Sequence, residues 1–573
     1  MILRALNIAT SSLLAQQKAI DVVSQNIANV NTPGYSRQTA QLASSVPERL
    51  AGRDFGTGVN VANVSRSLDP ILAQSQMANN SLTSLAQTLQ QGLANVGATF
   101  GNLDVPGLTT TLDDFFMAQQ QLANTPEDPL SSLNVQSRAQ DIVLRVSGMR
   151  QQLVDGQLAA NQEISPLITQ VNNLLTQIGG LNKHILVNES TGQLSNNAND
   201  LRDQRDLAVM ELSKLIPLQK VNTNNGGLIL QTPGGDLLVQ NDTVRQLRLG
   251  PAVGSSFSNI EFTDTGMPAQ GLEQGGKLGG LISLRDNQMA NYVQTLDSLA
   301  ANLTFTVNQL HSGGTGSTAV TQYTSVQASS NAAAAVNTDA TIPFASKIVN
   351  GSFTLHVLDG PPLTNPGGTA INITAGTTTL NQIATDITAV AGVTASVNAS
   401  GQLVVNGGAN RIAFTNDTSN FLAAYEINAF FNGSTAADFS VDAAILNDAG
   451  RIATGAADAT TSTIAPAGNS VALAILGLRD KAGSIDGSVA ASSVQRASNL
   501  ASTYGLDVAA ANQQVSYRQA EGSSLASQRA SISGVNMDEE LVNMMQFQRA
   551  YEAAAKIIQT SNQMLDSLMG LIR

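Results

Sequence analysis

The end of the chain carries a two-sided pattern of apolar and polar positions. Apolar residues recur at alternating steps of three and four between positions 544 and 572, and one serine interrupts them. This seam consists of Met544, Phe547, Tyr551, Ala554, Ile558, Ser561, Leu565, Leu568 and Ile572. Glutamine and charged residues dominate the opposite side. The pattern predicts a two-faced helix whose apolar side needs a partner.

The beginning of the chain repeats the same alternation. Its seam consists of Leu6, Ala9, Leu13, Gln16, Ile20, Val23, Ile27 and Val30, and Gln16 is the polar member. The two ends therefore match in period and in length. We expect them to pair as a coiled coil, with the rest of the chain carried between them as an insertion.

Helical periodicity also dominates the interior of the chain. Heptad spacing runs from Val135 to Ile185 with one extra step of four, which predicts one long helix. Further helices are expected at about 69–96, 113–123, 276–311 and 493–530, and short strands at about 38–65 and 228–249. These elements predict a helical bundle that carries small β hairpins.

Composition changes between residues 313 and 470. This segment has 9 Asp and Glu residues against 3 Lys and Arg, and it is rich in Thr, Ala, Asn and Gly. Strands are expected at 352–358, 371–374, 393–397 and 402–405, with one helix at about 379–390. The segment is therefore predicted to be a β-rich insert with an acidic, solvated exterior.

These patterns together predict an α+β multidomain protein with three parts. Residues 1–37 and 535–573 form the terminal coiled-coil module, and residues 38–312 and 471–534 form the bundle domain. Residues 313–470 form the inserted outer domain. The length of 573 residues agrees with several separate cores.

Charge and composition exclude several kinds of partner. The formal net charge is -13 and no cluster of Lys and Arg occurs, so a nucleic acid would be repelled. The chain lacks cysteine, which excludes disulfides and thiolate metal sites. The longest apolar run, 471–478, is far shorter than the roughly 20 residues that span a bilayer, and no signal peptide is expected.

An acidic segment is the best candidate for chemistry. Asp200, Asp203 and Asp206 follow one another at steps of three, with Arg202 and Arg205 between them. Three carboxylates on one side of a helix could hold a cation or act as an acid and a base. A solvated structural cluster, with Asn199 or Asp200 as the helix cap, is the favoured interpretation.

No other feature of the sequence favours an enzyme. The sequence has no Gly-x-Ser-x-Gly, His-Glu-x-x-His or Walker motif, so we expect no catalytic residue, metal or cofactor. His311 is one of three histidines and ends the helix predicted over 276–311. We expect it to interact with the helix dipole rather than with a ligand.

The segment that closes the first helix resembles a family signature. Asn31, Pro33 and Gly34 are helix-stop and turn residues at the end of the seam. They belong to a string that contains Asn26, Asn29, Asn31, Thr32, Gly34 and Tyr35. This string resembles the N-terminal signature of the flagellar rod, hook and hook-associated proteins. The strings 534–541, 546–550 and 558–561 follow in the order of the same family. The segment Asn199 to Asp206 is similar to its hook-associated members.

The resemblance implies a structural axial protein of the bacterial flagellum at the junction between hook and filament. It implies export through the flagellar type III apparatus, a cytoplasmic chaperone on the C-terminal helix, and a place between the hook protein and hook-associated protein 3. The terminal seams would then pack against copies of the same chain in a tube. Before assembly we expect both ends to be disordered. The alternative is another axial subunit, such as a hook or rod protein.

Overall fold

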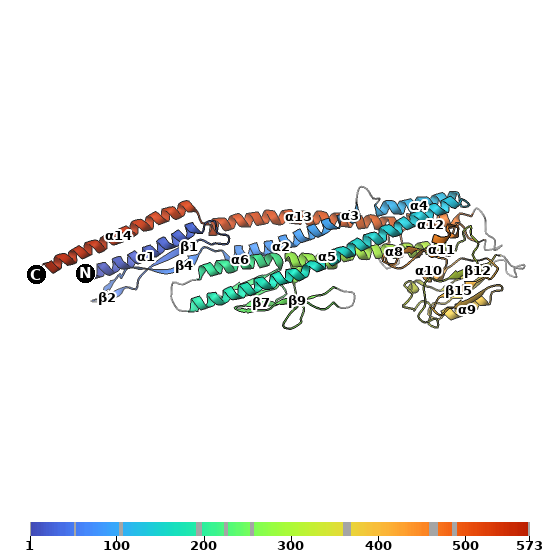
Figure 1. The fold of residues 1–573 in the computed structure, drawn as a ribbon, viewed down its shortest axis with the longest axis horizontal. Helices are drawn as coiled ribbons and strands as arrows, with labels where there is room; N and C mark the ends of the chain where they lie inside the picture. Colours follow the sequence, from blue (N-terminus) through green and yellow to red (C-terminus); the bar gives the residue numbers. More distant parts are fainter. Residues whose placement is uncertain are drawn as a thin grey trace. The chain divides into compact units, whose positions relative to one another are not determined.

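The computed structural model confirms an α+β protein with several parts (Figure 1). It describes residues 2–50, 53–101, 107–190, 198–222, 227–252, 257–358, 368–457, 468–483 and 490–570. The chain divides into two compact units. Unit 1 comprises residues 1–92, 159–284 and 509–573, and unit 2 comprises residues 93–158 and 285–508.

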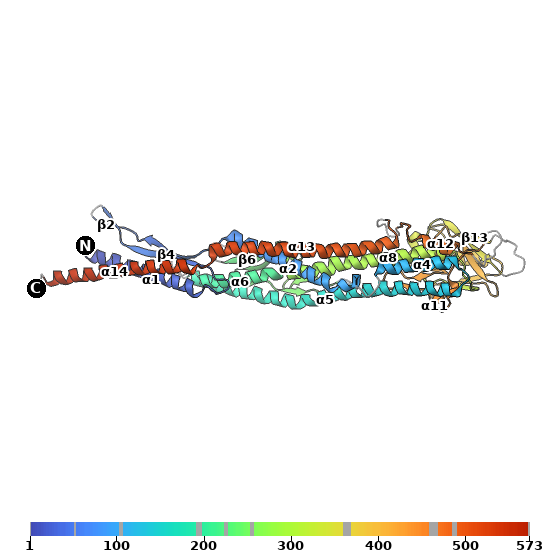
Figure 2. The same cartoon turned by 90° about the horizontal axis from the view of Figure 1, so that it is seen from above.

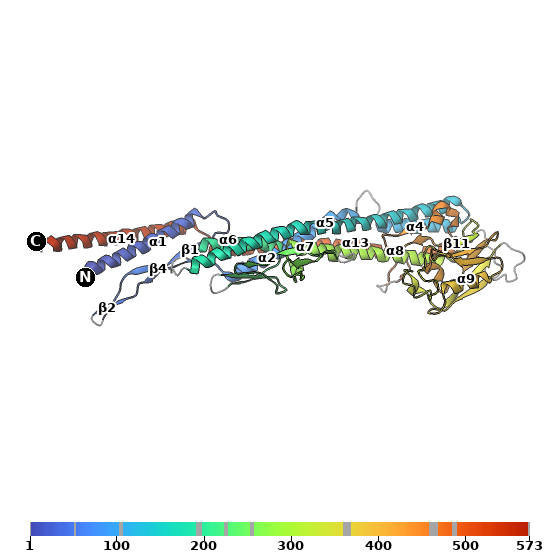
Figure 3. The ribbon, with the colours of Figure 1, turned by 60° about the horizontal axis from the view of Figure 1, so that its bottom comes forward.

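The two ends of the chain pair within unit 1, as predicted. Helix α1 (Ile2–Ala28) lies beside helix α14 (Met537–Gly570), and the two chain termini lie at the same end of the pair in Figures 1, 2 and 3. The helices are therefore antiparallel. Acidic residues Asp538, Glu539 and Glu540 occupy the first turn of α14, where the helix dipole favours negative charge.

A β excursion follows α1 and packs against it. Strands β1 (Gln38–Ser44) and β4 (Val59–Arg66) pair antiparallel, with a register shift between Gln41 and Leu42. Strands β2 (Glu48–Leu50) and β3 (Arg53–Phe55) form a second antiparallel pair. The short hairpin excursion that the sequence predicted over 38–65 is thus confirmed.

Long helices and small sheets make up the rest of unit 1. The helices are α2 (Pro70–Asn95), α6 (Asn199–Leu215), α7 (Gly276–Ser283) and parts of α5 (Pro129–Ser190) and α13 (Ser493–Ser533). The sheets contain β5 (Gln219–Asn222), β6 (Leu228–Gln231), β7 (Leu237–Gln240) and β8 (Thr243–Val244) in that order, and the pair β9 (Leu247–Leu249) and β10 (Ile260–Phe262). A 3₁₀ turn (Leu272–Gln274) precedes α7, and a π turn (Leu284–Gln288) follows it.

Helix α5 confirms the predicted long helix. The heptad positions Val135, Ala139, Ile142 and Val146 are at most 1% exposed. Because these positions recur on one side of the helix, a single face can pack against the bundle along its whole length. Pro166 lies inside the helix without ending it.

Unit 2 combines helices with the insert. Its helices are α3 (Gly97–Phe100), α4 (Leu108–Asn124), α8 (Met289–His311) and α12 (Ser470–Gly477). The insert has helices α9 (Leu380–Thr388), α10 (Phe421–Ala424) and α11 (Ala443–Asn447), and 3₁₀ turns at Ala345–Lys347 and Ala449–Arg451. Its strands are β11 (Gln322–Thr324), β12 (Gly351–Val357), β13 (Thr369–Ile373), β14 (Thr394–Val397), β15 (Leu403–Asn406), β16 (Ile412–Thr415), β17 (Phe431–Asn432) and β18 (Ser440–Val441).

The insert has an apolar core, to which α8 contributes Phe305. Two three-stranded sheets, ordered β11-β15-β14 and β13-β12-β16, enclose one apolar cluster together with α9 and α10. Thr379 caps α9 by accepting the Gln382 N–H, and Leu380, Ile383 and Ile387 of α9 are buried. The predicted strands and the predicted helix of this segment are therefore present. The two compact units cut the chain at other residues than the three predicted domains, so that three-part division stays a prediction.

Candidate functional site

The C-terminal seam faces inward in the structure. Ala554 and Ser561 are buried, and the other members between 544 and 565 are half-buried. These half-buried members are Met544, Phe547, Tyr551, Ile558 and Leu565. Leu568 is 46% exposed, and Ile572 lies outside the described residues. The predicted face of α14 is thus the face that α1 covers.

The N-terminal seam is only partly buried. Ala9 and Val23 are buried, whereas the remaining apolar members are half-buried. These are Leu6, Leu13, Ile20, Ile27 and Val30. The fully buried stripe is Ala15, Ala19, Val22 and Asn26, one position before the predicted seam. The shift has a physical reason, because α1 packs against β1 and β4 as well as against α14.

Large apolar side chains remain exposed on the outer faces of the pair. Leu3 and Leu14 of α1 are 68% and 61% exposed, and Val542, Ile557 and Met569 of α14 are 58%, 51% and 69% exposed. Exposed apolar groups that gather on one element are typical of an interaction surface.

Asn26 is the centre of a polar node at the inner end of the helix pair. Its side chain is fully buried and makes four hydrogen bonds. Oδ1 accepts the N–H of Gln38 at 2.9 Å and the hydroxyl of Tyr35 at 2.8 Å. Nδ2 donates to the Gln38 carbonyl at 2.8 Å and to Oε2 of Glu540 at 3.0 Å. Asn26 therefore closes the turn after α1 and holds the start of α14.

Glu540 ties α14 to this node. The residue is 1% exposed, and Oε1 accepts Nε of Arg37 at 2.8 Å. Arg37 also reaches the exposed Glu539 at 3.2 Å. A buried carboxylate is stable only with such partners, so the register of α14 against α1 is fixed here.

The acidic segment of α6 forms the other half of the node. Oδ2 of Asp203 accepts the Ser36 N–H at 3.0 Å, and Oδ1 binds Arg66 at 2.6 Å. Asp206 binds Arg66 at 3.1 Å and Lys220 at 2.6 Å.

Asp200 joins the same node through neutral donors. It accepts one amide hydrogen bond from Gln25 at 3.0 Å and one from Gln38 at 2.9 Å. The three carboxylates therefore bind residues of other elements, and they connect α6 to α1, β1, β4 and β5.

Burial and charge act against each other in the node. Burial raises the pKa of Asp203 although Arg66 opposes it. Burial would also raise the pKa of Asp206, but Lys220 and Arg66 outweigh it and lower that pKa. Burial, with Asp200, Asp203 and Glu540 nearby, raises the pKa of the Tyr35 hydroxyl, so it stays a hydrogen-bond donor.

The structure corrects the interpretation of the acidic segment in two respects. The cluster is structural, but Asp203 and Arg205 are buried rather than solvated, whereas Asp200 is exposed as expected. Neither Asn199 nor Asp200 caps α6, because Asn199 instead donates to Gln38 and to the Val64 carbonyl. Within the described residues no group of three His, Cys, Asp or Glu could hold a metal ion.

The remaining residues of the family motif shape the turn. Asn29 donates to the Gln25 carbonyl at 3.0 Å and accepts the Thr32 hydroxyl at 3.1 Å, whereas Asn31 is exposed. Gly34 has φ +83°, and a Cβ there would lie 3.3 Å from Cβ of Leu207. Glycine is favoured at position 34 because the backbone there is left-handed and because Leu207 leaves little room for a side chain.

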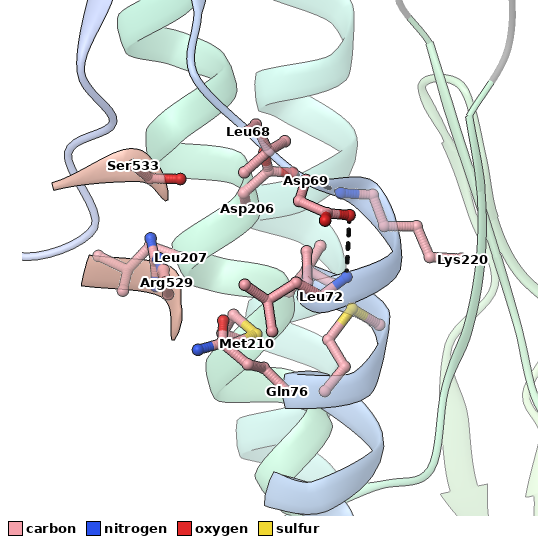
Figure 4. Close-up of a pocket in the computed structure, with 13 residues that line it drawn as sticks. Leu68, Asp69, Leu72, Gln76, Asp206, Leu207, Met210, Lys220, Arg529 and Ser533 are labelled. Carbon is pink, nitrogen blue, oxygen red and sulfur yellow. Dashed lines mark hydrogen bonds and ion pairs between the residues drawn. The ribbon is translucent and has the colours of Figure 1, made fainter. Parts of the chain in front are cut away.

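A small cavity of about 60 Å³ lies next to the node in unit 1. Figure 4 shows side chains of α2, α6 and the end of α13 around it, among them Leu72, Met210 and Arg529. Asp206 and Lys220 of the node form part of its wall. Arg529 donates to the Gly34 carbonyl at 3.5 Å, which joins α13 to the motif turn.

His311 is a second correction. It ends α8, but it is fully buried, and burial lowers its pKa to about 4. Its Nδ1 lies 2.8 Å from the Asn428 carbonyl, and its Nε2 accepts the Ala453 N–H at 2.9 Å. The ring is therefore a neutral connector between α8 and the insert, and the expected interaction of a charged imidazole with the helix dipole is wrong.

Family models match three parts of the chain. Residues 93–322 match the flagellar hook-associated protein FlgK helical domain. Residues 6–35 match the flagella basal body rod protein, and residues 526–571 match the flagellar basal body rod FlgEFG protein C-terminal model.

Proteins named flagellar hook-associated protein 1 are similar over nearly the whole chain. The protein of Salmonella typhimurium is 27% identical over 589 residues, and that of Escherichia coli is 26% identical over 599 residues. Each alignment covers 99% of this chain and 99% of the relative. The chain belongs to the family of flagellar hook-associated protein 1.

Membership of the hook-associated protein 1 family confirms the resemblance drawn from the motifs. The protein is a structural axial protein of the bacterial flagellum, at the junction of hook and filament. A hook or rod subunit is not favoured, because the model that matches 93–322 is described as the helical domain of the hook-associated protein and the relatives matched over 99% of the chain are named flagellar hook-associated protein 1.

A solved structure described as the flagellar hook junction protein FlgK from Burkholderia pseudomallei also aligns. It has 16% identity and a TM-score of 0.48, and the alignment covers 80% of this chain and 100% of that one. Among the described residues of this chain, no helix is long and apolar enough to cross a membrane.

Proposed function

We propose that this protein joins hook and filament through its two terminal helices. The observation that carries the proposal is the pair α1 and α14, which buries one seam and leaves large apolar side chains exposed on its outer faces. In a tube of stacked copies those outer faces would be covered by neighbouring chains. Each end of that tube would then contact a different axial protein.

The polar node fixes the register of this helix pair. Two helices that meet through apolar heptad seams can also pair after a shift of one or more helical turns. A buried polar group commonly fixes one register of such a pair. Asn26 and Glu540 supply that device here. The subunit-interaction role assigned to the seam residues of α1 and α14 stays a prediction of this proposal.

The partners follow from the family and from the exposed faces. We expect the hook protein below and hook-associated protein 3 above, with copies of this chain beside it. Before export, the exposed apolar side chains of α14 would favour aggregation, and a cytoplasmic export chaperone bound to this helix would shield them. Transport through the flagellar type III apparatus would then bring the chain from the cytoplasm to the growing flagellum. The role is structural, with no catalysis, cofactor, nucleic acid or membrane insertion.

Labelled electron microscopy tests the location. An antibody or gold label on the insert should give a single band between hook and filament in intact flagella. A label distributed along the whole hook, or along the rod, would contradict the proposal.

Hydrogen exchange tests the state before assembly. Both ends are helical in the single chain, yet they bury little of their surface. We therefore expect weak protection of amides in residues 2–30 and 544–570 of the isolated monomer and strong protection after assembly. Strong protection in the isolated monomer would contradict the expected disorder.

A further inference from the structure

Within unit 2, a loop of the insert forms hydrogen bonds with the carboxyl-terminal end of α8. The loop runs from Glu426 to Gly433. Oδ1 of Asn308 accepts the Phe430 N–H at 2.8 Å, and Nδ1 of His311 lies 2.8 Å from the Asn428 carbonyl. These contacts join α8 to the insert through buried hydrogen bonds of neutral groups.

The side chain of Glu426 closes this loop. The residue is 1% exposed, and its Oε1 accepts the Gly433 N–H at 3.0 Å. Its second oxygen, Oε2, is buried without a hydrogen-bond partner among the described residues. Oδ1 of Asn432, one residue before Gly433, is in the same situation. Buried acceptors without a donor are costly, and a proton on Glu426 converts one of these acceptors into a donor.

The groups around Glu426 disfavour its charged form. Burial raises the pKa of Glu426 to about 7, and the carboxylates of Asp438 and Asp442 raise it as well. The Gly433 N–H lowers this pKa, and so does the nearby Gln327 side chain, which makes no regular hydrogen bond to Oε2; together they do not offset burial.

His311 is a further titratable group at this joint, in addition to Asp438 and Asp442. Asp442 acts on it and raises its pKa, but burial dominates and keeps the ring neutral. It therefore supplies no positive charge that could stabilise an ionised Glu426.

We propose that Glu426 is a proton-operated latch, whose neutral form holds the loop around the end of α8 and whose ionisation loosens it. The proposal goes beyond the junction function, since assembly through the terminal helices does not involve this loop. The proton concentration of the medium would thereby set how firmly the insert is held to its helix. The sign follows from the raised pKa: the contribution of Glu426 is complete below its ordinary pKa and is lost as the pH rises to about 7.

Hydrogen exchange of the full-length chain between pH 5 and pH 8 tests this. The variant Glu426→Gln keeps an oxygen for the Gly433 N–H but carries no ionisable proton. The readout is the protection of the Phe430 and Gly433 amides, corrected for intrinsic exchange, as the ratio of variant to wild type. The ratio cancels the opposing titration of His311, which both chains share. It should rise roughly tenfold per pH unit from about pH 5 to pH 7 and then level off.

A second variant makes the test independent of how well Glu426→Gln folds. Asp442→Asn removes a neighbouring negative charge and keeps a side-chain oxygen that can cap α11. It should move the levelling-off point of the wild-type profile to lower pH without removing it. A variant-to-wild-type ratio that does not change with pH, or an Asp442→Asn profile with an unmoved levelling-off point, would overturn the latch.

Discussion

Replacing Asn26 by alanine should open the polar node far more than the same change at Asn29. Asn26 is fully buried and makes four hydrogen bonds, three of them to Tyr35 and Gln38 and one to Glu540. At about 1 kcal/mol each these bonds suggest about 4 kcal/mol, and we expect about 3 kcal/mol because bonds in one network are not additive. Asn29 is half-buried and bonds only within its own turn, so we expect about 1 kcal/mol there.

Hydrogen exchange on the assembled protein, in which we expect the terminal helices to be ordered, measures this difference at reporter amides outside the mutated bonds. Suitable amides are those of Ser36, Arg37 and Ser67, whose acceptors are Asp203, Ser533 and Arg37. Asn26→Ala should accelerate their exchange roughly 100-fold and Asn29→Ala roughly fivefold, since 1.4 kcal/mol corresponds to a factor of ten. Equal acceleration by the two variants would refute Asn26 as the centre of the node.

Three further changes test other parts of the structure. Glu540→Gln should lower the free energy of opening the polar node in the assembled protein by about 2 kcal/mol, because it removes a buried charge-assisted hydrogen bond. Glu539→Gln at an exposed pair should cost less than about 0.5 kcal/mol, and exchange of the Arg37 amide compares the two variants. His311→Gln should gain about 3 kcal/mol of unfolding free energy relative to wild type between pH 7 and pH 4, because the wild-type protein loses stability as the pH falls from 6.5 to about 4; urea unfolding at the two pH values measures it, and an equal loss in both chains would contradict it. Val209→Ile should raise the thermal midpoint of unit 1, because one added methylene in the 60 Å³ cavity contributes up to about 0.8 kcal/mol; a lower midpoint would show that the cavity cannot accept it.

Elements with strong periodicity could be predicted from the sequence. Helix α5 packs along one face, so its heptad residues determine both its extent and its buried side. The same holds for the seam of α14, which packs against α1. The most buried positions of α1 lie one residue before the predicted seam. Helix α1 packs against α14 and against β1 and β4, so it buries two adjoining stripes, and a single heptad pattern reveals only one of them.

The polar node could be predicted only in part. The motif residues Asn26 and Tyr35 and the carboxylates of α6 were singled out, but nothing local indicated that they meet. Arg66 binds Asp203 across 137 positions, and Asn26 binds Glu540 across 514. Such contacts depend on how distant elements pack, and a spacing rule for one helix does not contain that information. Arg66, which directly follows the hairpin predicted over 38–65, was the available signal for a buried carboxylate partner.

Incorporation of seam variants into flagella tests the central claim most directly. One variant replaces Phe547, Tyr551 and Ile558 of the inward face by glutamine. The control replaces the exposed polar residues Gln548, Glu552 and Gln559 by alanine and leaves the exposed apolar side chains of α14 in place. Both are labelled on the insert and observed by electron microscopy in cells that lack the wild-type protein. We predict that the control forms a single band between hook and filament and that the seam variant is absent from the flagellum and found in the medium. A seam variant that occupies the junction as the control does would contradict assembly through the terminal helices.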